Sequence, residues 1–382
     1  MKKTKKLLKK LFPVVLLNKA HLHYNKLRIN TFDKVLFPEH ALLKKDYILQ
    51  RDAYPFNGTT IDTRQLDHRL QHQIEIWQNW TQDEYLLIYN QPCIIEPRAG
   101  WALTASNKLI YASLGFSRVA YLRKPAIAAL RMRNSSIEEY TELISLRDTG
   151  EENYYHFYND LLAKLFFLED KLHLAKDIPI LIAAALYKKP FFQYFLQHPY
   201  LRDRTWIVQD KQYVRSYKTY FCKPLTHTAP YYERVRLLAL PQDIASTTLE
   251  RRIFITRSPK RLRFIENGAE IEQLCLDAGF EVVDFDTISI AEQIQTLASS
   301  RYVIGIHGAG LVNMLFRGNK PMGLLEIFPP GEYYAFHYML LAAQLNYTYD
   351  GMIGEISKNR FSGSFFVSPE ELNQRIQHLL KN

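Results

Sequence analysis

The sequence predicts an α/β protein built from two Rossmann-like halves. The first reason is length, because 382 residues exceed one ordinary domain and are comfortable for two. The second is the alternation of strand-length apolar runs with helical segments, which is typical of largely parallel sheets covered by helices. The third is a composition of 47% hydrophobic and 23% charged residues, which is normal for a chain that buries real cores.

The first half, residues 21–235, is expected to form one Rossmann-like domain. Helices are predicted over Tyr154–Leu172 and near Phe191–Gln197, and the polar stretch Asp67–Trp80 has a helical pattern. Three prolines make Pro224–Thr248 irregular, so we place the boundary between the domains there. The strand-length apolar runs are Tyr85–Tyr89, Cys93–Glu96, Val119–Leu122, Glu142–Leu146, Ile178–Ala184 and Trp206–Val208.

The second half has the clearer pattern, and residues 245–355 are expected to form a compact doubly wound domain. Helices are predicted over Ala269–Ala278, Ile290–Ser299 and Tyr334–Leu345, with Thr287 and Ser289 as candidate N-caps of the second. The last segment, residues 366–382, should hold a terminal helix that begins at Ser368 and Pro369. The predicted strands are Arg252–Thr256, Glu281–Phe285, Tyr302–Ile306, Gly323–Phe328 and Tyr347–Tyr349.

The formal net charge of +10 favours an anionic partner. Much of the basic excess lies in residues 1–20, where the apolar residues between the lysines could form one face of a short helix. Such a basic amphipathic segment could rest on an anionic membrane surface, and a solvated, frayed terminus is the equal alternative. Nucleic acid is not expected, because the other basic residues cluster at one strand end and no nucleic-acid-binding motif is present.

The compartment expected is cytoplasmic, with the basic segment a candidate for peripheral contact with the inner face of the membrane. No stretch approaches the roughly 20 apolar residues of a spanning helix. The apolar run Leu11–Leu17 is short, contains Pro13 and lacks a cleavage pattern. Cys93, Cys222 and Cys275 are few and scattered, so neither a disulfide framework nor a zinc site is indicated.

The strongest local signal is Tyr302–Met314, YVIGIHGAGLVNM. A hydrophobic strand runs into the small-residue turn His307–Gly310 and then into a helix. Gly308 and Gly310 let backbone N–H groups approach an anion, and the helix N-terminus adds unpaired donors and the positive end of its dipole. A diphosphate suits this place, and an ordinary tight strand-to-helix turn is the equally weighted alternative.

A second signal is the basic cluster Arg257, Lys260, Arg261 and Arg263, directly after the first strand of the same domain. Ligands of open α/β sheets bind outside the carboxyl ends of the strands, so Arg257 and the end of Tyr302–Ile306 should converge on one crevice. A guanidinium beside a helix N-terminus is well suited to hold a diphosphate. We expect Lys260 and Arg261 to belong to a solvated loop.

A third signal opens the long helix of the first half. Asn153 has the residue type of an N-cap, and His156 and Asp160 are spaced i, i+4, which places them on one helix face. On a helix rich in Leu and Phe, this polar face must point to solvent or line a cleft. From the pattern alone, a surface His–Asp pair is the commoner case.

Taken in order, these signals resemble glycosyltransferase family 61. That family shows an N…H…D motif on a first-half helix, an arginine-rich segment ending in Asn-Glu, a Gly-Phe-Glu-Val-Val-like strand, a helical Gln, an HGA turn and a Glu-containing strand before a proline. The resemblance covers roughly residues 150–350 and departs from the family at Asn267-Gly268, where the family has Asn-Glu. The matching positions are Asn153, His156, Asp160, Arg257, Arg263, Asn267, Gly279–Val283, Gln293, His307–Ala309, and Glu326 before Pro329.

The resemblance implies a GT-B fold, in which two Rossmann-like domains face a cleft, and we expect the C-terminal helix to pack back towards the first domain. It implies an inverting, metal-independent transfer of a hexose or pentose from a nucleotide donor, with UDP favoured, to a hydroxyl of a glycan or lipid-linked glycan, as in capsule synthesis. No cofactor is expected beyond the nucleotide-sugar co-substrate. Asp284-Phe285-Asp286 has metal-site spacing but ends a strand. A non-catalytic nucleotide-binding scaffold of a polysaccharide assembly complex is the alternative.

The resemblance also implies roles for single residues. Without a metal ion, the charge on the leaving diphosphate must be met by the helix dipole and arginines. Inversion needs a base for the acceptor proton; Asp160 is the first candidate and His156 the second, and Asp160 could instead orient His156. Asn153 is placed on the acceptor side, and Glu326 could accept hydrogen bonds from the ribose. The donor-binding residues implied are Arg257, Arg263, Asn267, His307, Gly308, Ala309, Gly310 and Glu326.

Overall fold

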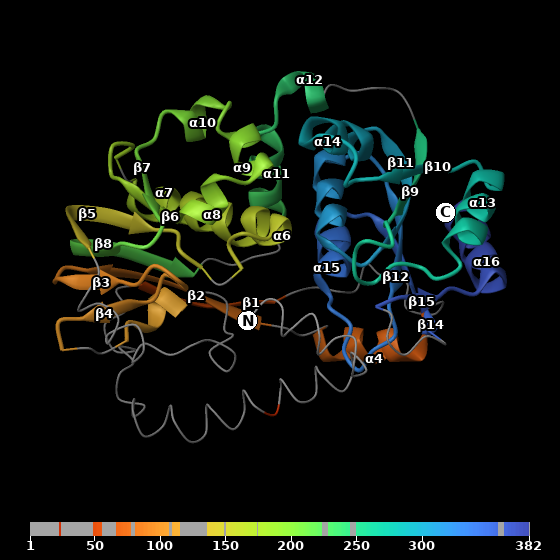
Figure 1. Ribbon diagram of the computed structural model, residues 1–382, viewed down its shortest axis with the longest axis horizontal. Helices are drawn as coiled ribbons and strands as arrows, with labels where there is room; N and C mark the ends of the chain where they lie inside the picture. The colour runs from red at the N-terminus through yellow and green to blue at the C-terminus, as the bar shows by residue number, and fades with distance from the viewer. Residues whose placement is uncertain are drawn as a thin grey trace. The chain divides into compact units, whose positions relative to one another are not determined.

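The computed structural model describes residues 49–55, 66–77, 81–106, 109–114, 136–148, 150–173, 175–223, 228–244, 250–357 and 363–381, together with His23. The predicted basic segment 1–20 and the predicted strand Val119–Leu122 lie outside these residues. Within them, no helix is long and apolar enough to cross a membrane. The chain is mixed α/β, as predicted, and divides into two compact units with a sheet each (Figure 1).

The N-terminal unit comprises the described residues of 19–54 and 82–226, and the C-terminal unit those of 55–81 and 227–382. The polar stretch predicted to be helical forms α4 (His68–Trp77). This helix and α11 (Ala229–Leu237), which lie inside the range 21–235 of the first expected domain, group with the C-terminal unit. The short helix α12 (Pro241–Ile244) does the same.

The sheet of the N-terminal unit has eight strands. Its main order is β1-β2-β8-β5-β6-β7, and β3 pairs with both β8 and β4. Strand β5 is parallel to β8 and β6, and β6 is parallel to β7, whereas β2 and β3 run antiparallel to β8. The strands are β1 (Leu49–Pro55), β2 (Thr81–Tyr89), β3 (Cys93–Ile95), β4 (Ala102–Thr104), β5 (Ile137–Ser145), β6 (Ile180–Ala183), β7 (Trp206–Gln209) and β8 (Tyr213–Lys223).

The helices of this unit lie around β6 and β7, and β3 and β4 extend the sheet beside β8, away from the helices (Figure 1). The predicted long helix is present from Tyr154 to Leu172, but its second segment is wound as a π-helix. Its segments and the other helices are α6 (Tyr154–His156), η7 (Phe157–Leu162), α7 (Ala163–Leu172), α8 (Ala184–Tyr187), α9 (Pro190–Phe195) and α10 (Pro199–Arg202), with the 3₁₀ turn η5 at Tyr111–Leu114.

The sheet of the C-terminal unit has five strands, all parallel, in the order β10-β9-β11-β12-β13. The first strand in sequence thus lies inside the sheet, and the winding direction reverses between β9 and β11, which makes the sheet doubly wound as predicted. The strands are β9 (Arg251–Thr256), β10 (Glu281–Asp284), β11 (Ser300–Ile306), β12 (Gly323–Phe328) and β13 (Thr348–Ile353).

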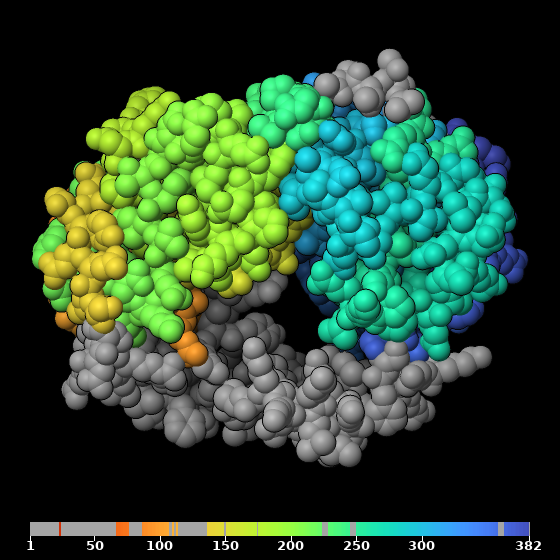
Figure 2. Space-filling view, turned by 45° about the horizontal axis from the view of Figure 1, so that its top comes forward, coloured from red at the N-terminus to blue at the C-terminus, as the bar shows by residue number. Residues whose placement is uncertain are grey.

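Helices cover both faces of this sheet (Figure 1). On one face, α13 (Gly268–Asp277) and α16 (Pro369–Leu379) share a core with the strands, while α14 (Ile290–Ala298) packs with η8 (Ala309–Arg317) on the other. In the view of Figure 2, the teal and light-blue atoms of this region form much of the surface of the unit. The remaining elements are α15 (His337–Gln344), β14 (Glu355–Ile356) and β15 (Phe365–Phe366).

The structure refines one expectation for this unit, the helix after the turn, and changes another, the packing of the terminal helix. The helix expected after the His307–Gly310 turn is present, and it is wound as a 3₁₀-helix. The terminal helix α16 was expected to pack back towards the first domain. Its apolar face, Leu372, Ile376 and Leu379, is instead buried in the core of its own unit, because these three residues recur at helical spacing and complete the layer that α13 begins.

Candidate functional site

The carboxyl ends of β9 and β11 border the point at which the winding of the C-terminal sheet reverses, where ligands of such sheets bind. Arg257 follows β9 directly, and His307 follows β11. The Arg257 guanidinium donates from Nη2 to the His307 carbonyl at 3.4 Å and from Nη1 to the Leu262 carbonyl at 3.3 Å. The structure therefore brings Arg257 to the His307–Gly310 turn, as expected from the strand ends.

Gly308 lets the Arg257 guanidinium lie close to the backbone of the turn. A Cβ atom at this position would lie 2.1 Å from Arg257 Nη2, far inside contact distance. The backbone of Gly308 is extended, with φ 177°, so a side chain here would cause no backbone strain but would displace the Arg257 guanidinium. At Gly310, which follows Ala309 in the first turn of η8, a Cβ would meet Phe285 Cδ2 at 3.0 Å. The small residues thus let two neighbours approach the turn.

Positive charge is concentrated beside this turn. Burial, followed by repulsion from Arg263, lowers the pKa of Arg257 to about 10. Arg263 is exposed, and its backbone is left-handed, with φ 63°. Two guanidiniums that repel each other indicate a place that an anion would stabilise.

His307 is held by a buried carboxylate on the neighbouring strand. Its Nδ1 lies 2.5 Å from Glu326 Oε1, and the Tyr349 hydroxyl donates to Glu326 Oε2 at 2.7 Å. Glu326 is completely buried on β12. Both carboxylate oxygens are therefore engaged by side chains inside the unit.

The other predicted residues of this unit have partners that explain their positions. The Asn267 amide donates to the Val367 carbonyl at 2.9 Å and to Glu270 at 3.0 Å, which fixes the chain before α16. Arg261 makes two 2.6 Å hydrogen bonds to Asp286, in an exposed loop as expected. The Gln293 side chain donates to the Phe285 carbonyl at 2.9 Å, within the protein interior.

In the N-terminal unit, the N…H…D residues lie together at the start of the long helix. The Asn153 side chain accepts hydrogen bonds from the backbone N–H groups of Tyr155 and His156, as an N-cap does. His156 Nδ1 lies 2.5 Å from Asp160 Oδ2, and Asn159 donates to Asp160 Oδ1 at 2.9 Å. Asp160 is only 4% exposed, so the expectation of a surface pair is wrong.

The chain segment that precedes this helix takes part in two buried ion pairs, one within the segment and one to Lys164 on α7, which the sequence analysis did not identify. Arg147 Nε lies 2.9 Å from Glu151 Oε1, and Lys164 Nζ lies 2.5 Å from Asp148 Oδ2. Burial disfavours the charged form of Lys164, but attraction to Asp148 and Asp160 outweighs this and raises its pKa. The signal in the sequence was a run of charged residues directly after the buried end of β5.

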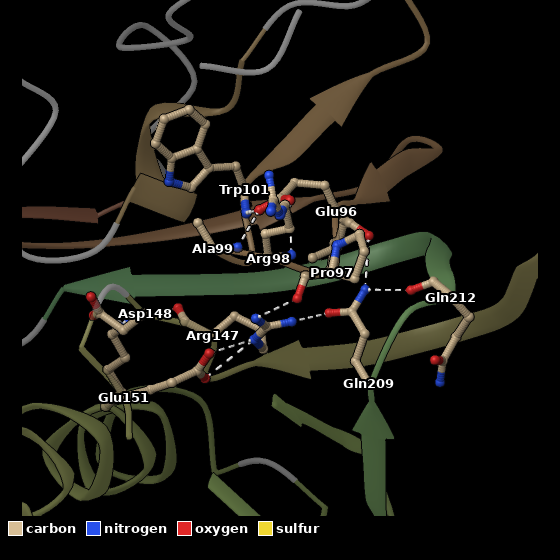
Figure 3. Close-up of polar contacts among 12 residues, drawn as sticks. Glu96, Pro97, Arg98, Ala99, Trp101, Arg147, Asp148, Glu151, Gln209 and Gln212 are labelled. Atoms are coloured by element: carbon tan, nitrogen blue, oxygen red, sulfur yellow. Dashed lines mark hydrogen bonds and ion pairs between the residues drawn. The ribbon is translucent and has the colours of Figure 1, made fainter. Parts of the chain in front are cut away.

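Figure 3 shows how Arg147 joins separate segments of the N-terminal unit. Besides Glu151, its guanidinium donates to the Gln209 side chain and, at 3.1 Å, to the Pro97 carbonyl. Glu151 precedes the N-cap by two residues, and at Gly150 a Cβ would lie 3.1 Å from the His156 ring. The buried network thus fixes the turn against which His156 packs.

Comparison with known proteins gives one family. No curated protein matches the chain significantly. The family model described as Glycosyltransferase 61 matches residues 154–324. This range contains the His156–Asp160 pair, Arg257 and the His307–Gly310 turn. The resemblance found in the sequence is therefore confirmed, and the chain carries a Glycosyltransferase 61 domain over residues 154–324.

Proposed function

We propose that the chain is an inverting, metal-independent glycosyltransferase that moves a sugar from a UDP donor to a hydroxyl of a glycan or lipid-linked glycan. The family match supports sugar transfer. The observation that carries the donor assignment is the Arg257 guanidinium, held 3.4 Å from the His307 carbonyl beside the start of η8. A GT-B-type pairing of the two units and peripheral contact of segment 1–20 with an anionic membrane belong to this proposal.

The donor diphosphate would be held by charge and by backbone donors. Arg257 and Arg263 supply guanidiniums that suit phosphate oxygens. In the described part of the chain, no side chain caps the start of η8, so the N–H groups of its first turn can serve the diphosphate. Gly308 keeps the turn open to Arg257. Together these groups stabilise the negative charge that develops as UDP leaves.

The acceptor would be activated by His156, which Asp160 orients. Both Asp160 oxygens already accept hydrogen bonds inside the N-terminal unit, whereas the His156 side chain is 17% exposed. With Nδ1 bonded to Asp160, Nε2 is the nitrogen that takes the proton of the acceptor hydroxyl. The hydroxyl oxygen then bonds the anomeric carbon while the bond from that carbon to the diphosphate breaks. The geometry thus favours the second of the two bases considered from the sequence.

Titration of UDP into the purified protein, followed by calorimetry, tests the donor assignment. Arg257→Ala should weaken UDP binding by about 1.5–3 kcal/mol, the range for a hydrogen bond to a charged group. The matched control is Arg261→Ala, which removes an exposed guanidinium already paired with Asp286 and should change binding by no more than about 0.5 kcal/mol. Unchanged affinity in folded Arg257→Ala would overturn the assignment. Hydrolysis of UDP-sugars by the wild type separates an enzyme from a non-catalytic scaffold.

A further inference from the structure

Glu326 is a completely buried carboxylate in contact with His307. Burial and then the negative charge of Glu326 raise the pKa of Tyr349, so the tyrosine keeps its proton and remains a neutral donor. Among the described residues, His307 is the only basic side chain that forms an ion pair with Glu326. Since an ionised carboxylate is costly to bury without a cation, Glu326 is stabilised when His307 is an imidazolium.

The proton that the His307 ring gains or loses is the one on Nε2. Nδ1 lies against Glu326, and an ionised carboxylate can only accept, so beside ionised Glu326 the Nδ1 atom is the donor. The ring position is fixed, because the backbone N–H of His307 donates to the Ile327 carbonyl at 2.8 Å and the ring stacks on Phe328, with centroids 5.1 Å apart. The His307 side chain is 15% exposed, so the ring is accessible to solvent and to a ligand.

Charged and titratable groups on other elements lie around the His307 turn. The Arg257 guanidinium donates to the His307 carbonyl. Burial is the larger cause of the lowered pKa of Arg257, and repulsion from the nearby Arg263 is the second. On α15, the Tyr338 ring lies 5.6 Å from the His307 ring and His337 lies 6.5 Å away. Burial raises the pKa of Tyr338, and Glu326 raises it further while the two arginines lower it, so Tyr338 stays neutral.

One other acidic group acts on this cluster. Asp286 attracts the Arg257 charge, but its carboxylate is already paired with Arg261 in an exposed loop. Among the described residues, the turn therefore has the Arg257 and Arg263 guanidiniums beside it, with Arg261 paired to Asp286, and the buried Glu326 carboxylate beneath it. An anion that binds at the turn would add negative charge beside the arginines and would therefore stabilise an imidazolium at His307.

We infer that binding of a nucleoside diphosphate is coupled to the uptake of one proton by His307, an inference that rests on the proposed donor site. The diphosphate neutralises the repulsion from Arg257 and Arg263 and adds attraction of its own. The proton comes from solvent, settles on Nε2 and is donated in a hydrogen bond to a phosphate oxygen. It returns to solvent when the diphosphate dissociates. Glu326 and Tyr349 are positioning residues that hold the ring for this purpose.

Proton uptake can be measured directly with UDP as the probe. Calorimetric titrations of the full chain in buffers of different ionisation enthalpy give the number of protons bound per UDP. At mildly alkaline pH, the wild type should take up about one more proton than His307→Gln, because the titration of UDP itself cancels in the difference. Over the same range, UDP affinity of the wild type should fall by up to about tenfold per pH unit as pH rises.

Two further variants keep the test decisive. Glu326→Gln preserves the shape of the buried side chain but removes its charge, so it should also lower the proton uptake. His337→Gln is the matched control for a neighbouring histidine and should leave the uptake unchanged. Tight UDP binding with equal uptake in wild type and His307→Gln, or uptake lost only in His337→Gln, would overturn this inference alone. Failure of the wild type to bind UDP would overturn the proposed donor site as well.

Discussion

Each unit holds a histidine whose Nδ1 lies 2.5 Å from a buried carboxylate, but the two pairs are built differently. His156 and Asp160 are four residues apart on one helix. His307 and Glu326 are nineteen residues apart and meet across the parallel strands β11 and β12. The second carboxylate oxygen accepts from an amide, Asn159, in the first pair and from a tyrosine hydroxyl in the second.

The charges around the two pairs also differ. Near His156, Arg147 is paired with Glu151 and Lys164 with Asp148, so the buried charges compensate each other. Near His307, Arg257 and Arg263 repel each other, and the buried acid Glu326 contacts His307 and Tyr349 instead of either arginine. A histidine among compensated charges is suited to act as a neutral base, whereas one beside excess arginines is suited to bind an anion. The same type of histidine–carboxylate pair is therefore suited to proton transfer in one unit and to anion binding in the other.

The largest effect should come from His156. His156→Ala should lower kcat by about 10²–10⁴-fold, the usual loss when a general base is removed, and leave UDP affinity unchanged. Asp160→Asn should also lower kcat, because the ring loses the carboxylate that fixes its tautomer. Steady-state kinetics of both variants, with UDP binding measured in parallel, checks this expectation.

The matched control is His173→Asn, at the exposed C-cap of the same helix, where φ is 48° and Asn tolerates a left-handed backbone. It should keep wild-type kcat. If Asp160→Asn lost its activity while His156→Ala kept a nearly normal kcat, Asp160 would be the base, as first expected from the sequence. Normal activity in both variants would show that this helix face takes no part in catalysis.

The next effect should be on stability. Arg147→Met keeps much of the side-chain packing but leaves Glu151 buried without its cation, which should lower the free energy of unfolding by about 3–5 kcal/mol. Burial raises the pKa of Glu151, so the folded variant favours the protonated acid and should lose less stability at about pH 5 than at about pH 8. Urea denaturation at both pH values measures the difference.

An exposed pair provides the comparison for this variant. Arg202 and Asp203 are both more than half exposed, so Arg202→Met should cost less than about 1 kcal/mol. If Arg147→Met proved as stable as Arg202→Met, the network in Figure 3 would not hold the turn before the helix.

The smallest effect is expected from removing metal ions. If arginines, helix dipole and His307 meet the charge of the leaving diphosphate, treatment with EDTA should leave the transfer rate within about twofold of the untreated value. The candidate Asp-x-Asp pair supports this, because Asp286 is bound by Arg261 and Asp284 accepts a hydrogen bond from the backbone of its own turn. Loss of activity in EDTA that Mn²⁺ restores would contradict metal independence.

Local patterns predicted much of this molecule. Gly323–Phe328 is a continuous apolar run and forms β12 with the expected bounds. Ser289 caps α14 in a capping box with Glu292, and Ser368 caps α16. The i, i+4 spacing of His156 and Asp160 fixed their contact, because a single turn of helix determines it.

Features that depend on distant partners were not predicted. The central strand β8, YVRSYKTYFCK, has no clean apolar pattern, because Arg215 and Lys218 pair with Glu139 and Glu142 on the neighbouring β5. The bond between His307 and Glu326 depends on which strands are neighbours and in which register. Sequence spacing contains neither piece of information.

The β11–β12 register gives the C-terminal pair a consequence for folding. Gly305 lies opposite Glu326, and a slip of one residue would turn Glu326 to the other face of the sheet, away from His307. The His156–Asp160 pair needs only local helix, which forms in about a microsecond, whereas the second pair must await a correctly aligned parallel sheet. Binding of UDP during refolding should therefore report the moment at which these strands reach their native alignment.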